Sequence, residues 1–207
     1  MAGHFLTLEG GEGAGKSTQA RLLATGLCAL GLPVLRTREP GGAPGSERLR
    51  SLLMAGETDW SAEAETLLHF AARAEHIART IRPALAAGFW VICDRFTDST
   101  LAYQGYGMGA DRDLITRLSD LVGLTPDITF ILDISENTSN LRVSSRGENT
   151  DRYERLDASF HARVNAGFRA IAAAAPERCV LIAADAREDA VLQAIMTALR
   201  NRLALPP

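Results

Sequence analysis

The feature that most constrains this chain is a glycine-rich segment that follows an apolar run near its start. The run, residues 4–9, is typical of a buried strand. The next nine residues read Gly-Gly-Glu-Gly-Ala-Gly-Lys-Ser-Thr and fit the pattern G-x-x-x-x-G-K-[ST] at every position. Residues 19–30 then show a helical pattern. A strand, this loop and a helix in that order predict a cradle for a polyphosphate.

The residue types in this loop match the needs of a bound phosphate chain. Glycines remove the Cβ atoms that would block the approach of backbone amides, which then point into a concave nest at a helix N-terminus. Lys16 adds a mobile charge for the β- and γ-phosphates, and Ser17 supplies a hydroxyl for Mg²⁺. The alternative is a glycine-rich turn without a ligand. It is disfavoured because Lys and Ser stand in register after an apolar run.

Composition narrows the class of protein. The 207 residues suit a single domain, 1–207, and the net charge of −3 gives no indication of nucleic-acid binding. We find no apolar run near the roughly 18 residues that span a membrane, and no signal peptide. Cys28, Cys93 and Cys179 are odd in number and far apart, so they are expected to be small buried hydrophobes in a reducing compartment. We therefore expect a cytoplasmic protein with no nucleic-acid or membrane partner.

Strand and helix patterns alternate along the rest of the chain. Further strands are expected at 32–37, 89–95, 128–133 and 180–183, and a long helix at 61–87 that Pro83 kinks. Other helices are expected at 111–121 and 189–203. This alternation predicts an α/β fold with three layers, α/β/α, around a central five-stranded parallel sheet.

Two polar groups of residues stand out beyond the loop. The third strand ends in Asp94-Arg95, which suits a carboxylate that holds Mg²⁺ and a guanidinium that grips a second phosphate; a strand-end salt bridge is the alternative. Thr100 and Gln104 lie four apart, and the Gln amide offers a donor and an acceptor to a nucleobase edge.

The residues alone leave the roles of two further segments undecided. His69, Phe70 and Arg73 can share a helix face, but on the residues alone a core Phe70, a solvated His69 and an ion-paired Arg73 are favoured. The arginine-rich segment 142–155 is expected to be a flexible LID that clamps anions, or else an ordinary solvated loop.

Taken together, the motifs resemble the bacterial thymidylate kinases, P-loop nucleoside monophosphate kinases, over nearly the whole chain. Five pieces that carry the resemblance occur in order: the 10–18 loop, Thr-Arg-Glu-Pro-Gly-Gly at 37–42, the helix with Arg73, Asp94-Arg95 with Ala-Tyr-Gln-Gly at 102–105, and Asp-Arg-Tyr-Glu at 151–154. The second piece and the Ala-Tyr-Gln-Gly piece are the specific ones.

The resemblance implies transfer of the γ-phosphoryl group of Mg·ATP to dTMP, giving dTDP and ADP for dTTP synthesis. It also implies a set of roles. The expected ATP-binding residues are Gly10, Gly11, Glu12, Gly13, Ala14, Gly15, Lys16, Ser17, Thr18 and Arg142. The expected dTMP-binding residues are Glu12, Glu39, Arg50, His69, Phe70, Arg73, Arg95, Thr100, Tyr103 and Gln104. The expected catalytic residues are Lys16, Arg95, Arg146 and Arg152, with Ser17 and Asp94 as Mg²⁺ ligands, directly or through water.

Some points stay open at this level. Relatives usually carry Phe four residues before the base-reading arginine, where this chain has His69, so either His69 stacks on thymine or Phe70 is brought in. The choice between Arg146 and Arg152 as the transition-state arginine is open, and the resemblance suggests a homodimer. Competing functions are a kinase for another nucleoside monophosphate and a non-catalytic ATP-binding scaffold. A GTPase is disfavoured because Asn-Lys-x-Asp is absent.

Overall fold

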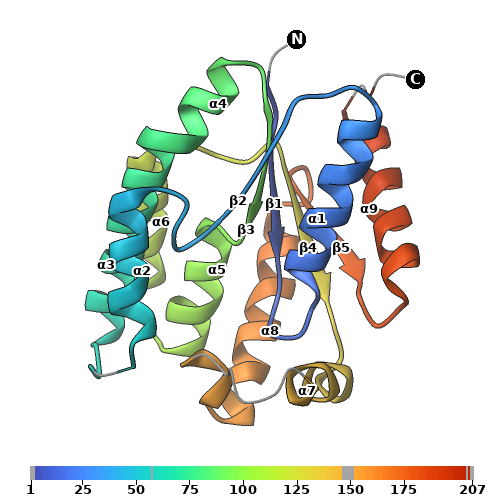
Figure 1. Cartoon of the computed structure of the whole chain (residues 1–207). Helices are drawn as coiled ribbons and strands as arrows, with labels where there is room; N and C mark the ends of the chain where they lie inside the picture. The colour runs from blue at the N-terminus through green and yellow to red at the C-terminus, as the bar shows by residue number, and fades with distance from the viewer. Residues whose placement is uncertain (1–2, 57, 146–151, 204, 206–207) are drawn as a thin grey trace.

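A central parallel sheet with helices on both faces forms the molecule (Figure 1). The structure, a computed structural model, describes residues 3–56, 58–145, 152–203 and 205, and for Glu154 the backbone alone. The five strands pair in the order β2-β3-β1-β4-β5, and every pairing is parallel. The strands are β1 (Phe5–Glu9), β2 (Val34–Arg38), β3 (Trp90–Asp94), β4 (Ile128–Asp133) and β5 (Cys179–Ala183).

The helices form the two outer layers. In Figure 1, α1 and α9 pack side by side on one face of the sheet, and α4, α5 and α8 lie on the other. The helices are α1 (Lys16–Ala29), α2 (Pro44–Met54), α3 (Ala62–His76), α4 (Arg82–Ala86), α5 (Thr97–Thr100), α6 (Arg112–Val122), α7 (Glu136–Ser144), α8 (Ala158–Ala174) and α9 (Glu188–Arg202). Three further turns are helical: the π-helical η1 (Ile77–Ile81) and η2 (Leu101–Gly107), and the 3₁₀ turn η3 (Tyr153–Arg155).

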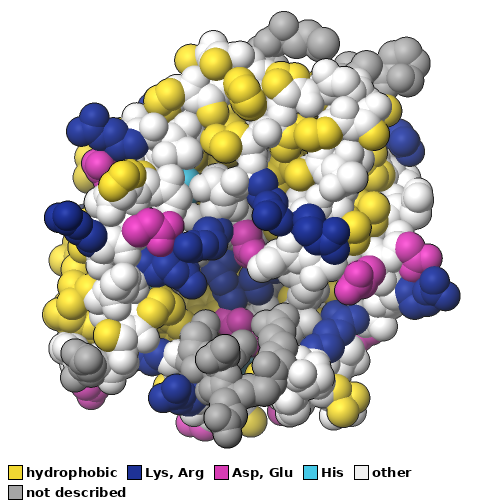
Figure 2. All heavy atoms as spheres, in the orientation of Figure 1, with side chains coloured by type: hydrophobic (Ala, Val, Ile, Leu, Met, Phe, Trp, Pro, Cys, Tyr) yellow, Lys and Arg dark blue, Asp and Glu magenta, His cyan; other side chains and the backbone are white. Residues whose placement is uncertain are grey.

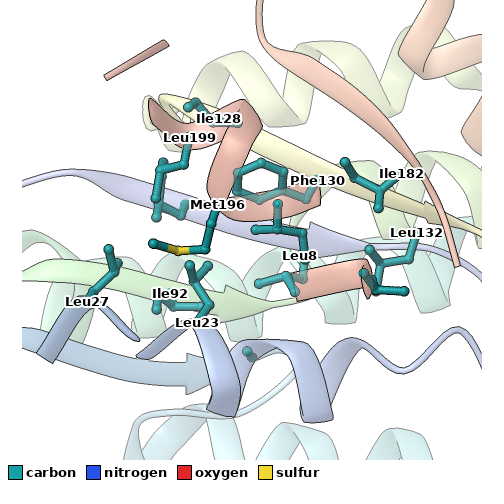
Figure 3. Close-up of a cluster of buried hydrophobic side chains, with 14 of the residues drawn as sticks. Leu8, Leu23, Leu27, Ile92, Ile128, Phe130, Leu132, Ile182, Met196 and Leu199 are labelled. Atoms are coloured by element: carbon teal, nitrogen blue, oxygen red, sulfur yellow. The ribbon is translucent and has the colours of Figure 1, made fainter. Parts of the chain in front are cut away.

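The central strands are apolar along their length because both of their faces are covered. In β1, side chains at alternate positions point to opposite faces. Leu6 and Leu8 pack in the core under α1 and α9, whereas Phe5 packs on the other face with Ile77 and Phe96. Figure 3 shows the first of these cores, where side chains from the sheet interlock with those of α1 and α9. Its labelled members are Leu8, Leu23, Leu27, Ile92, Ile128, Phe130, Leu132, Ile182, Met196 and Leu199.

The expected sheet is confirmed, and the differences have identifiable causes. The long helix 61–87 is three consecutive pieces, α3, η1 and α4, because Pro83 has no N–H for a regular helical bond and the chain widens into a π turn just before it. Helix α7 was missed, so Arg142 lies on a helix rather than in a loop. Cys28 was expected to be buried but is exposed on α1, whereas Cys93 and Cys179 are buried as expected.

No helix in the described part of the chain combines the length and the apolarity needed to traverse a bilayer.

Truncating Phe130 tests the core between the sheet and α9. Phe130→Ala should lower the free energy of unfolding by about 3–5 kcal/mol, because its fully buried ring would leave a cavity. Leu141→Ala, at a side chain that is 73% exposed, should change it by less than about 0.5 kcal/mol. Urea unfolding of both variants measures the difference, and similar losses would contradict this description of the core.

Candidate active site

The polar segments singled out in the sequence converge at the carboxyl edge of the sheet. The glycine-rich loop follows β1, the Pro-Gly-Gly turn follows β2, and Arg95 follows β3. This edge is where open α/β sheets bind ligands. Two adjoining hollows lie here and share four lining residues: Glu12, Glu39, Arg50 and Arg95. Figure 2 shows Lys and Arg side chains gathered around a hollow on this face, with acidic side chains inside it.

The glycine-rich loop lines the first hollow, which we call the phosphate hollow. Its lining residues are Glu12, Gly13, Gly15, Lys16, Ser17, Thr18, Arg38, Glu39, Arg50, Asp94 and Arg95. Gly15 has a φ of 88° and is the N-cap of α1. Lys16 Nζ donates to the carbonyl oxygens of Gly10 at 3.0 Å and Gly11 at 2.7 Å. Burial and the nearby Arg95 lower the pKa of Lys16 to about 8. The loop thus holds an ammonium group against its own carbonyls, ready for an anion.

A hydroxyl and a carboxylate face each other in the phosphate hollow. Ser17 Oγ donates to Asp94 Oδ2 at 2.5 Å, and both residues line this hollow with Lys16. Hydroxyl and carboxylate oxygens are the ligands that Mg²⁺ prefers. The donor set at this point therefore fits the metal expected from the sequence.

Arg95 bridges the two hollows. Its φ of 69° is unusual for a residue other than glycine, and its side chain forms an ion pair with Glu12 at 2.5 Å. Arg95 also donates to Tyr103 Oη at 3.1 Å, and Tyr103 Oη donates to Glu12 at 2.6 Å. Burial would raise the pKa of Glu12, but Arg95 and Lys16 outweigh it and lower that pKa to about 2. Glu12 is therefore an ionised acceptor at the junction of the hollows.

Beneath the turn that carries Arg95 lies a fully buried acid, Glu9. Its two carboxylate oxygens accept from the Phe96 backbone amide at 2.7 Å and from Ser99 Oγ at 2.5 Å. Burial and the nearby carboxylate of Asp98 raise the pKa of Glu9 to about 7. Glu9 thereby anchors the strained turn from below.

The second hollow, which we call the base hollow, has a buried guanidinium in its wall. Arg73 is 2% exposed; its Nε donates to Glu39 Oε2 at 2.7 Å and its Nη2 to Phe96 O and Thr100 Oγ1. His76 Nδ1 lies 3.0 Å from the other oxygen of Glu39. Within the described chain, Arg73 Nη1 has no hydrogen-bond partner although it is buried. Such an atom is costly to leave unpaired, so Nη1 is suited to donate a hydrogen bond to a ligand.

The remaining wall of the base hollow comes from α3, α5 and η2. It is lined by Thr100, Tyr103, Gln104 and His69. Burial and the nearby charge of Arg73 lower the pKa of His69 to about 3. Phe70 does not line it. Phe70 packs instead with Ala110 and Ile115 under α6.

The predicted residues Arg50, Arg142 and Arg152 lie at or near these hollows. Arg50 lines both hollows and donates to Pro40 O at 2.9 Å. Arg142 lines a third hollow next to the glycine-rich loop and donates to Gly13 O and Ala184 O. Arg152 forms an ion pair with Glu65 beyond the base hollow, and Arg146 lies outside the described residues.

Sequence reasoning missed Glu65 and Met54, and it gave no role to Phe96, Ser99 and Tyr153. Met54 and Tyr153 line the base hollow, and Glu65 is fully buried directly behind it. Glu65 had a signal, since its position four residues before His69 places both on one helix face. The signal is weak, because Glu65 also belongs to the acidic first turn of α3, where a carboxylate is common.

Comparisons with known proteins agree on one family. A family model described as thymidylate kinase matches residues 8–195. A thymidylate kinase from Gluconobacter oxydans (strain 621H) is 50% identical over 205 residues, covering 97% of this chain and 96% of that protein. One from Caulobacter vibrioides is 50% identical over 206 residues, covering 98% and 99%. The crystal structure of thymidylate kinase from Ehrlichia chaffeensis has a TM-score of 0.78 and 37% identity, covering 97% of this chain and 99% of that one.

Titration of Glu9 should be visible in stability. A carboxyl whose pKa is higher in the folded state takes up a proton on folding, so the contribution of Glu9 to the free energy of unfolding should fall as pH rises from about 5 toward 8. Glu9→Gln removes this contribution, so the free energy of unfolding of wild type minus that of the variant should fall over the same interval. Urea unfolding at several pH values measures both proteins, and parallel curves would contradict the raised pKa.

Proposed function

The chain belongs to the thymidylate kinase family and is an enzyme that phosphorylates dTMP with ATP as the phosphate donor; we propose that the two hollows hold these substrates end to end. The triphosphate occupies the phosphate hollow, and dTMP occupies the base hollow with its phosphate toward Arg95. A P–O bond to an oxygen of the dTMP phosphate forms as the bond between the β- and γ-phosphates of ATP breaks, giving dTDP and ADP.

The observation that carries this assignment is the unpartnered Nη1 of Arg73 in the wall of the base hollow. A buried donor fixed by three other hydrogen bonds suits a carbonyl oxygen of a base, and thymine presents one at C4. Gln104 and Thr100 complete the polar edge that the base meets. His69 lies in this hollow and Phe70 outside it, which favours His69 as the ring that stacks on thymine.

The residues at the junction suit the reacting phosphates. Two anionic groups approach each other, and Lys16 and Arg95 supply positive charge beside them. Glu12, ionised by its surroundings, is suited to accept a hydrogen bond from the sugar 3′-hydroxyl. Tyr103 packs beside the sugar position, which disfavours a 2′-hydroxyl. No general base is needed, because a phosphate monoester oxygen is already nucleophilic near neutral pH.

Mg²⁺ is the proposed metal, held by Ser17 and Asp94 directly or through water. When bound, it neutralises phosphate charge.

Arg142 beside the loop is suited to pack against adenine. Arg146 and Arg152 both stay proposals for the transition-state arginine, within the proposed LID at 142–155. The cytoplasm is the proposed location, since all three cysteines are free thiols.

A panel of nucleoside monophosphates tests the substrate. With ATP and Mg²⁺ in a coupled assay for ADP, dTMP should give a higher kcat/KM than dCMP, dAMP or dGMP. Lys16→Met should lower kcat with dTMP by on the order of 10³-fold, because a positioned charge on the transferred group is lost. Equal or faster turnover of another monophosphate would overturn the substrate assignment, and a Lys16→Met enzyme of normal rate would overturn the role of the loop.

A homodimer is the proposed assembly. Helices α3 and α6, with η1 and α4, line an apolar groove. In Figure 1, α3 and α6 lie at the left of the molecule and α1 and α9 at the right. The groove is lined by Leu67, Phe70, Ala71, Ala74, Ile77, Ala78, Arg82, Leu118, Leu121 and Val122. Leu121 is 79% exposed and Leu67 51% exposed. Large apolar side chains clustered on a surface favour burial against another chain, and a second copy would cover this groove without closing the cleft.

Light scattering after size-exclusion chromatography tests the dimer. Leu121→Glu should shift the mass from that of two chains to that of one, because the carboxylate would be buried unpaired in the interface. Leu141→Glu, at an equally exposed leucine on α7, should leave the mass unchanged. A monomeric wild-type protein would contradict the proposal.

A further inference from the structure

A buried carboxylate that the proposed chemistry does not use lies behind the base hollow. Glu65, on α3, is 0% exposed. Its Oε1 accepts from Gln104 Nε2 at 2.8 Å and from Tyr153 Oη at 2.8 Å, and its Oε2 accepts from Arg152 Nη1 at 2.5 Å. These contacts join a helix, the π turn η2 and the turn η3. Arg152 supplies the opposite charge that a buried carboxylate requires.

The carboxylate fixes which end of the Gln104 amide faces the ligand. An ionised carboxylate can only accept hydrogen bonds, so the Gln104 atom beside Glu65 must be the NH₂ group. That NH₂ group also lies 3.2 Å from Tyr153 Oη. The amide carbonyl Oε1 is left without a hydrogen-bond partner in the described chain, on a residue that lines the base hollow. The hollow therefore presents an acceptor at this point.

Tyr153 fixes the direction of a hydrogen bond to His69 in the same way. Because its hydroxyl donates to Glu65, the lone pairs of that oxygen are left to accept from Gln104 and from His69 Nε2 at 3.0 Å. His69 is neutral near pH 7, since its pKa is lowered to about 3. The proton of the neutral ring is accordingly on Nε2, and Nδ1 is an acceptor. One carboxylate thus sets the direction of several hydrogen bonds around the base.

We propose that Glu65 is a specificity-determining positioning residue: by fixing the Gln104 amide, it makes the base hollow select a pyrimidine that carries a hydrogen on N3. This inference rests on the proposed function, in which the hollow binds the base of dTMP. Thymine has an N3–H donor that meets Gln104 Oε1. Cytosine has a lone pair at N3 and an amino group at C4, so it places an acceptor against Gln104 Oε1 and a donor against Arg73.

Fixing the amide matters because a glutamine alone does not discriminate. Gln104 turned by 180° would offer its NH₂ group and accept cytosine at N3 as readily as it now accepts thymine. With Glu65 in place, the turned amide would bring two acceptor oxygens together inside the protein, with the Tyr153 hydroxyl to share between them. That arrangement is costly. Sites that hydrogen-bond a substrate N–H reject analogues without it by large factors, on the order of 10⁴.

The test compares Glu65→Gln with wild type, using dTMP and the monophosphate of 5-methyldeoxycytidine, which differs from dTMP only at the C4–N3 edge. A glutamine at position 65 can donate or accept, so Gln104 is freed to turn. We expect the ratio of kcat/KM for the two nucleotides to fall by about tenfold or more, through a higher KM for dTMP, with the KM for ATP unchanged.

Glu63→Gln is the matched control, because Glu63 lies on the same helix but is exposed. It should leave the ratio at the wild-type value. The proposal is overturned if Glu65→Gln keeps the wild-type ratio, or if it lowers kcat/KM for both nucleotides by the same factor, as a merely structural role would.

A measurement on the unaltered protein covers the case in which Glu65→Gln does not fold. In the presence of a non-hydrolysable ATP analogue, dTMP should raise the Tm and the 5-methyldeoxycytidine nucleotide should raise it far less. Equal shifts, in an enzyme that still phosphorylates dTMP, would overturn the role of Glu65 and leave the proposed function standing. Absence of dTMP phosphorylation would instead overturn the function itself.

Discussion

The buried charge of Arg73 is the constraint on which the site depends. A guanidinium so deeply enclosed requires a counter-charge and hydrogen-bond acceptors. Glu39 from the turn after β2 supplies the charge, and the backbone after β3 accepts a second bond. The ion pair therefore ties α3 to two separate strand ends and fixes the width of the base hollow. Removing either charge would strand the other in the interior, at a cost of about 3–5 kcal/mol.

Under the proposed function, substrate recognition in this cleft is an exchange of partners. In the structure, Lys16 is satisfied by loop carbonyls, Arg95 by Glu12, and Ser17 by Asp94. Each of these groups is one that a phosphate, a metal ion or a sugar would engage. The site is thus preorganised by internal contacts that hold its side chains in place, and a ligand replaces interactions of similar type rather than creating order from a mobile surface.

The sequence was sufficient for the sheet and for most of the cleft, because both follow from local rules. The glycine-rich loop, the strand ends and the alternation of elements each depend on a few neighbouring residues. Features that depend on distant partners could not be found in this way. The positions of His69 and Phe70 differ by one helical step, and only packing against α6 determines which of them faces the cleft. The role of Glu65 likewise depends on its hydrogen bonds with Gln104 and Tyr153, which are 39 and 88 residues away in the sequence.

The π turn η2 has a consequence for how this part of the chain tolerates change. It carries Tyr103 and Gln104, adjacent residues that both line the base hollow. In a helix each added or removed residue rotates the side chains that follow by about 100°. Single-residue insertions or deletions between Thr97 and Tyr103 would therefore rotate both side chains away from the base hollow. The segment is thus constrained in its length as well as in the residues that line the hollow.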